Sequence, residues 1–241
     1  MKNIIIPTVL EEDTINAVRT AIAPKRNNAC GIVLLLLKDI PDDFSATSTL
    51  KSLSYTWTAA QEDVLNTCRR IVSDNCNVKL EIHHQFEITK PLLRNLMDYF
   101  DGELVILTPS FKNSKTKVNC RLVKLLLSSK YTLLHLNSVE VQSMTSALYI
   151  EPKTTSFSVQ ELQQLISNKF CFRIISRTKL SDELTLQDAN PIIAEAIVSK
   201  QIDMLIETRT QQQSKVKEAA TLQHMTFSVP VLSIYEEDLL N

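Results

Sequence analysis

The 241-residue chain contains only two glycines, Gly31 and Gly102, where average usage of about 7% would give roughly 17. Loops that wrap phosphate groups depend on glycine, because the backbone has to approach the anion closely and adopt positive φ. The shortage argues against a phosphate-binding loop, and neither a P-loop nor a Rossmann glycine fingerprint occurs in the sequence.

The chain also lacks an excess of charge, with 26 Lys and Arg against 27 Asp and Glu. Without a basic block it lacks the electrostatic footprint of a nucleic-acid-binding protein. Its richest apolar run, Ile32 to Leu37, is far shorter than the about 20 residues of a membrane span. The opening Ile4–Ile6 is followed by Pro7 and acids, unlike a signal peptide. We therefore expect a cytoplasmic protein with no nucleic-acid or membrane partner.

Residues for metal or nucleophilic chemistry are sparse. His83 and His84 are adjacent on a strand pattern and so point to opposite faces, while His135 and His224 are isolated. No nucleophile elbow occurs, and we expect neither a metal site nor catalytic residues. The cysteines are odd in number and form no C-x-x-C pair, which predicts mostly buried thiols outside disulfides at Cys30, Cys68, Cys76, Cys120 and Cys171.

Short apolar runs alternate with segments of helical periodicity in the first half. Apolar runs without polar alternation are typical of strands buried on both faces, and they predict strands at Asn3–Pro7, Gly31–Lys38, Val78–Phe86, Glu103–Thr108 and Tyr131–Leu136. Apolar stripes at helical spacing predict helices at Glu12–Ala23, Trp57–Val72, Lys90–Phe100 and Ser114–Ser128. Between the second strand and the next helix, Pro41–Thr56 is polar and is expected to be a long loop.

The second half repeats this order in outline. Predicted strands are Ala147–Glu151, Phe170–Ser176, Asp203–Thr208 and Val229–Tyr235, and predicted helices are Ser158–Ser167, Pro191–Lys200 and Ser214–Met225. Shifting the chain by 100 residues aligns Pro91, Ile106, Thr108, Ser114, Lys115 and Lys117 with Pro191, Ile206, Thr208, Ser214, Lys215 and Lys217. We interpret this as an internal duplication whose second copy is shorter.

The predicted fold class is α/β. Alternating strands and helices favour parallel sheets with helices on both faces and right-handed crossovers. We expect two doubly wound domains with mainly parallel five-stranded sheets, the second shortened. The polar stretch Asn137–Ser146 separates them, which gives domains at 1–138 and 139–241.

On these residues the chain resembles the universal stress protein family in its tandem form. The resemblance rests on Ile4–Pro7 after Met-Lys, the acidic helix start Glu11–Asp13, the strand Val33–Leu37 before Lys38-Asp39, and the strands Leu104–Leu107 and Leu133–Leu136. It covers residues 1–137 well and 145–236 weakly. It implies doubly wound sheets that pair through their last strands, here Tyr131–Leu136 and Val229–Tyr235, either within the chain or in self-association.

Many members of that family bind ATP at the carboxyl ends of the first and fourth strands, and this sequence departs from the binding pattern. The family's Asp after the first-strand proline is replaced by Val9. Its glycine loop is replaced by Thr108-Pro109-Ser110-Phe111 and by Asn119-Cys120-Arg121, and the second half has Thr208-Arg209-Thr210-Gln211. We expect side chains, Phe111 included, to occupy the triphosphate space, so that ATP is not bound and no cofactor is held.

The same positions are the candidates for any ligand site. The resemblance implies a site formed by Thr8, Val9, Lys38, Thr108, Ser110, Asn113, Ser114 and Lys115. Hydroxyls and a lysine at a helix start could hold a phosphate or carboxylate. The simpler interpretation is that Ser114 caps the helix and the lysines face solvent.

Three hypotheses for function follow. The first is a non-enzymatic tandem universal-stress-like protein, a stress-response module that acts through ligand sensing or protein contacts. The second is a nucleotide or small-anion binder with an unconventional loop. The third is an enzyme of unrelated chemistry on the same scaffold, since fold does not fix function.

Overall fold

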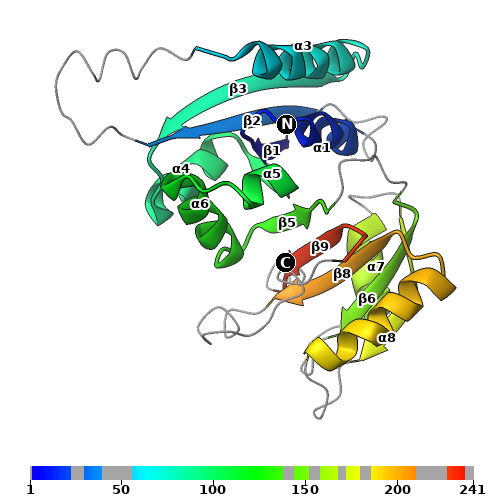
Figure 1. The fold of residues 1–241 in the computed structure, drawn as a ribbon. Coiled ribbons are helices and arrows are strands. Elements are labelled where there is room, and N and C mark those ends of the chain that lie inside the picture. Colours follow the sequence, from blue (N-terminus) through cyan, green and yellow to red (C-terminus); the bar gives the residue numbers. More distant parts are fainter. Residues whose placement is uncertain are drawn as a thin grey trace.

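The structure is a computed structural model, and it describes residues 2–22, 30–39, 56–137, 144–151, 158–167, 172–179, 186–209 and 227–236. Within them, strands and helices alternate along the chain (Figure 1). The strands are β1 (Asn3–Pro7), β2 (Cys30–Lys38), β3 (Val78–Phe86), β4 (Gly102–Leu107), β5 (Thr132–His135), β6 (Ser146–Glu151), β7 (Arg173–Lys179), β8 (Met204–Arg209) and β9 (Val231–Tyr235). The helices are α1 (Asp13–Ile22), α3 (Ala59–Ser73), α4 (Lys90–Tyr99), α5 (Pro109–Lys112), α6 (Lys117–Leu127), α7 (Val159–Ser167) and α8 (Leu186–Ser199).

All nine strands belong to one sheet in the order β3-β2-β1-β4-β5-β9-β8-β6-β7. Every neighbouring pair is parallel except β5 and β9. Parallel strands with helices on both faces confirm the α/β, doubly wound prediction. Strand β2, which has a neighbour on each side, reads CGIVLLLLK and is buried along most of its length, as its unbroken apolar run predicts.

The two halves meet at β5 and β9, where Leu133 lies opposite Ser233 and Leu134 opposite Leu232. This pairing joins the strands that the resemblance singled out, and it turns the two expected sheets into one. Each of the two strands has neighbours on both sides. A second copy could therefore use them only by displacing this pairing.

Strand order in the second half follows that of the first with one strand fewer. The first five strands run β3-β2-β1-β4-β5 and the last four run β9-β8-β6-β7. In chain order within its half, β6 corresponds to β1, β7 to β2, β8 to β4 and β9 to β5. The outermost strand of the first half, β3, has no counterpart among the described residues of the second.

Apolar side chains fill both faces of the sheet. On one face a continuous core runs under α1, α3 and α7 and includes residues from both halves. On the other face, one core lies under α4, α5 and α6, and a separate one lies under α8. Two helices begin at capping residues: Thr58 and Gln61 form a capping box at α3, and Thr89 caps α4 ahead of Pro91.

The structure differs from the predicted elements in two places. The turn Pro109–Lys112 is helical (α5), and the next helix begins at Lys117 rather than Ser114. Helix α8 begins at Leu186, so that Pro191 lies inside it. The predicted helix Ser214–Met225, residues 41–55 of the predicted loop, and the 138/139 domain boundary lie outside the described residues.

The four described cysteines divide evenly between core and surface, and none of them forms a disulfide. Cys30 and Cys68 are buried, whereas Cys76 and Cys120 are exposed, so burial is less general than predicted; Cys171 lies outside the described residues. In the described part of the chain no group of His, Cys, Asp and Glu is arranged to hold a metal. No helix there is long and apolar enough to cross a membrane.

Candidate functional site

The candidate site lies where β1 and β4 end, the place at which open α/β sheets bind ligands. An open groove of about 580 Å³ is found there. It brings together four of the eight candidate residues, Val9, Ser110, Asn113 and Ser114. The rest of its lining is Glu11, Glu12, Asp13 and Pro109.

Thr8 lies below the groove and is buried. Its hydroxyl is 2.6 Å from that of Thr14 and accepts a 2.8 Å hydrogen bond from the backbone N–H of Leu10. Leu10 adopts a left-handed backbone with φ of 59° and is itself buried. The Thr8 side chain is therefore engaged in holding the β1–α1 connection and does not present its hydroxyl to the groove.

Asp13, the first residue of α1, bridges the two walls of the groove. Its Oδ2 accepts a hydrogen bond from the backbone N–H of Ser110, and its Oδ1 accepts one from the Ser110 hydroxyl, both at 2.7 Å. The carboxylate is buried, although Glu11 and Glu12 beside it are exposed. A charged acceptor on a backbone N–H makes a strong hydrogen bond. This side chain therefore already takes the amide that a ligand oxygen would need.

In the turn after β4, the phenyl ring of Phe111 does not fill the space expected for a triphosphate. Thr108 caps α5, and Phe111 is fully buried in the core beneath α4 and α6. The prediction that Phe111 plugs the groove is wrong. A single helical turn directs residue 111 toward the sheet and leaves Ser110 at the groove, so helical backbone replaces the glycine loop.

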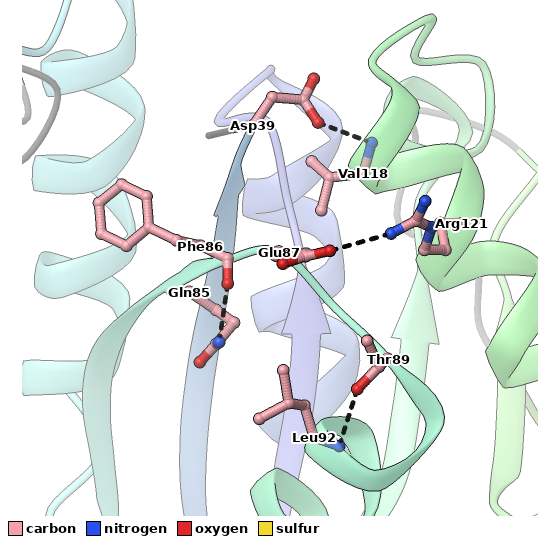
Figure 2. A network of polar contacts seen from close by, with 8 residues as sticks. All are labelled: Asp39, Gln85, Phe86, Glu87, Thr89, Leu92, Val118 and Arg121. Atoms are coloured by element: carbon pink, nitrogen blue, oxygen red, sulfur yellow. Dashed lines mark hydrogen bonds and ion pairs between the residues drawn. The ribbon is translucent and has the colours of Figure 1, made fainter. Parts of the chain in front are cut away.

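A second carboxylate lies at the start of α6. Asp39, just after β2, accepts a 3.1 Å hydrogen bond from the backbone N–H of Val118 (Figure 2). Nearby, Arg121 of α6 forms an exposed ion pair with Glu87, at 3.3 Å between Nη1 and Oε1. The first N–H groups of a helix attract anions. Here the chain supplies the anion itself.

Lysines do not line the groove. The amino group of Lys112 donates to the Leu136 carbonyl at 2.9 Å and to Asn137 Oδ1 at 3.0 Å. Burial lowers the pKa of this amine, and the nearby Asp13 partly opposes that shift. Lys38, half-buried at the end of β2, and Lys115, exposed before α6, are also absent from the lining. Among the described residues the lining thus carries three carboxylates and no cation, and it disfavours a phosphate.

The second half has a different arrangement at the equivalent strand end. Arg209, the last residue of β8, is buried and reaches across to the first half. Its Nη1 donates to the carbonyls of Leu127 at 2.9 Å and Ser129 at 3.3 Å, and its Nη2 donates to Tyr131. These carbonyls belong to the last residue of α6 and to residues just after it, where a cation is favoured by the helix dipole. Arg209 is therefore a structural clamp between the halves.

His135 lies at the same junction, opposite Val231 of β9. It is buried, and neither ring nitrogen has a hydrogen-bond partner. Burial, and then the charges of Lys112 and Arg209, lower its pKa to about 3. The imidazole is therefore neutral at physiological pH.

Sequence reasoning missed the two carboxylates that occupy backbone amides here, Asp13 in the groove lining and Asp39 at the start of α6. Both were visible in the sequence as an acidic helix start and as the residue after Lys38. Their partners are 97 and 79 residues away, so only the topology could reveal the contacts.

Comparison with known proteins agrees with this architecture. No protein-family model matches the chain, and no curated protein matches it. Among solved structures, it is similar to a functionally unknown protein, PA1789, from Pseudomonas aeruginosa PAO1, with a TM-score of 0.54 and 11% identity over 99% of this chain and 94% of that one. A protein from Pseudomonas aeruginosa UCBPP-PA14, described as a universal stress protein, matches at 0.54 and 10% identity over the same shares.

A universal stress protein from Archaeoglobus fulgidus DSM 4304 matches with a TM-score of 0.53 and 9% identity, over 97% of this chain and 96% of that one. This chain has the universal stress protein fold. At these identities the likeness shows the fold alone, and it says nothing about a ligand. The function has to be argued from the groove.

Proposed function

We propose that the chain is a tandem universal-stress-like protein that has no enzymatic activity and does not bind ATP in the manner of that family. The observation that carries the proposal is that internal carboxylates occupy backbone N–H groups at the starts of α5 and α6, of which the first lies in the groove lining. Asp13 takes the Ser110 amide at 2.7 Å and Asp39 takes the Val118 amide at 3.1 Å. A triphosphate in the groove would have to displace Asp13 from Ser110 and would meet Glu11 and Glu12 besides.

The tandem interpretation is supported by the junction of the halves. Under the 100-residue shift, Leu133 corresponds to position 233, and these two positions lie opposite each other in the β5–β9 pair. The repeated strand order supports the same interpretation. A contact between equivalent positions is what an internal twofold relation between two copies produces.

A protein of this kind would act through contacts with other proteins, or by sensing a ligand other than a nucleotide, as a stress-response module in the cytoplasm. The described residues offer no metal cluster, and those that line the groove include no histidine, cysteine or lysine. The Asp13 carboxylate and the Ser110 hydroxyl, which could serve as a base and a nucleophile, are bonded to each other.

A thermal-shift panel with ATP, AMP and small anions tests the proposal. We expect no saturable shift. A saturable ATP shift that Ser110→Ala removes would favour an anion binder with an unconventional loop instead. Turnover in an unbiased activity screen would favour an enzyme.

A further inference from the structure

Strand β3 forms one edge of the sheet and pairs only with β2 within the described part of the chain (Figure 1). The backbone carbonyl of Asn77, just before β3, points toward β2, because it accepts a hydrogen bond from the backbone N–H of Cys30. Because successive backbone groups alternate in direction along a strand, the N–H and C=O groups of Val78, Leu80 and Ile82 point away from β2. This open edge is a ready template for another strand.

The side chains along the edge form a self-complementary pattern, VKLEI, from Val78 to Ile82. Val78, Leu80 and Ile82 are half-buried and pack against the core under α1 and α3. Lys79 and Glu81 are exposed and point to the opposite face. Read in reverse, the order of apolar, charged and apolar positions is the same, with the sign of the charges exchanged.

We propose that a second copy of the chain binds antiparallel to this edge, with Leu80 opposite Leu80 of the second copy. In that register Lys79 faces Glu81 of the second copy, and Glu81 faces its Lys79, so two opposite-charge pairs form across the twofold axis. The outward-directed residues then pair with one another. The three pairs of outward-directed residues, Val78 with Ile82, Leu80 with Leu80 and Ile82 with Val78, could exchange about six backbone hydrogen bonds. About four remain, because the Val78 N–H of each copy already donates to the Asn75 carbonyl.

Neighbouring registers are less favourable. Moving the second strand by two residues in one direction places Lys79 opposite Lys79 of the second copy, and in the other direction it places Glu81 opposite Glu81. Like charges directly opposite each other destabilise a strand pair. The charges therefore select one register as well as the partner.

An exposed aromatic side chain is connected to β3 through two successive ring contacts. Tyr99, at the end of α4, is 79% exposed. Its ring centroid is 4.8 Å from that of Phe100, which is 5.1 Å from the ring of His83 on β3.

A five-residue strand pair buries less than the about 1,200–2,000 Å² of a stable interface. We therefore expect a weak dimer whose population rises with protein concentration.

The experiment is a charge-reversal set measured by analytical ultracentrifugation over a range of concentrations. We expect the wild type to dimerise, and we expect Lys79→Glu and Glu81→Lys each to weaken dimerisation about tenfold, because each creates two like-charge pairs. Mixing the two variants should restore association, since each carboxylate at positions 79 and 81 of one variant then faces an ammonium group of the other. The double variant should also dimerise, because both pairs again have opposite charges.

Lys130→Glu and Glu195→Lys, exposed charge reversals away from β3, are the matched controls and should leave dimerisation unchanged. Hydrogen exchange should show slower exchange of the Leu80 amide in the dimer. A wild type that stays monomeric at all concentrations overturns the proposal. So does a dimer that the two single variants leave intact, because it would use another surface.

Discussion

The carboxylate of Asp13 holds Ser110 at two points, through the backbone N–H and the side-chain hydroxyl, each at 2.7 Å. The contact joins the start of α1 to the turn after β4, 97 residues along the chain. The contact occupies the backbone N–H that a ligand anion would bind, although the groove itself remains open. The donors of Ser110 at the groove are therefore already bonded to a carboxylate of the chain itself.

Asp13→Ala should lower the free energy of unfolding by about 1–3 kcal/mol, because it leaves the half-buried amide and hydroxyl of Ser110 without their acceptor. Urea denaturation followed by circular dichroism measures the change. Glu12→Ala, an exposed neighbour, is the control and should stay within about 0.5 kcal/mol of the wild type. Equal effects of the two substitutions would mean that the Asp13 contact does not stabilise the fold.

Arg209→Ala should be more damaging, with a loss of about 3 kcal/mol or more, because several carbonyls after α6 lose a charged donor at once. Arg209→Lys should recover only part of this loss, since an ammonium cannot reproduce the planar fork of donors. Denaturation gives the free energies, and hydrogen exchange should show loosening at Ser129–Tyr131. Arg173→Ala, at an exposed position on β7, should have little effect, and a similar loss there would refute the clamp.

His135 should make stability fall in acid. Its pKa in the folded protein is lowered to about 3, below the about 6.5 of an unfolded chain. Between these values the unfolded state binds a proton that the folded state does not. The His135 contribution is therefore fully present above pH 6.5 and is lost as pH falls toward 3, at about 1.4 kcal/mol per pH unit.

His135→Leu should remove that slope and also remove two buried nitrogens that have no partner. The variant should be as stable as the wild type at pH 7 or more so, and the difference should grow in its favour as the pH is lowered to 4. Denaturation of both proteins across this range gives the comparison. Parallel pH profiles would show that the imidazole is not buried in a neutral form.

Much of the fold was predictable because parallel strands buried on both faces read as unbroken apolar runs. The bounds of β3 (Val78–Phe86) match the prediction, and those of β2 differ by one residue. Helix α5 was not predictable, because four residues are too few to show a periodicity. This helical turn also explains why the predicted position of Phe111 in the groove was wrong. The direction of the Phe111 side chain depends on the backbone conformation of α5.

The site was predictable in place but not in chemistry. The groove lies at the strand ends where the resemblance placed it, and half of the candidate residues line it. The character of the groove depends on a contact between residues distant in sequence, that of Asp13 with Ser110. Asp39 makes a similar contact with Val118 at the start of α6. Composition and spacing do not reveal such pairs, because each carboxylate accepts from a backbone N–H, and the one side chain that also donates, at Asp13, is a serine with nothing to distinguish it from the others in the sequence.

The central claim is that internal carboxylates exclude the phosphates of a nucleotide from the groove, and isothermal titration of ATP into the wild-type protein tests it most directly. We predict no saturable heat of binding with or without Mg²⁺. Saturable ATP binding that AMP competes for, and that substitutions at Ser110 or Ser114 weaken, would contradict the account.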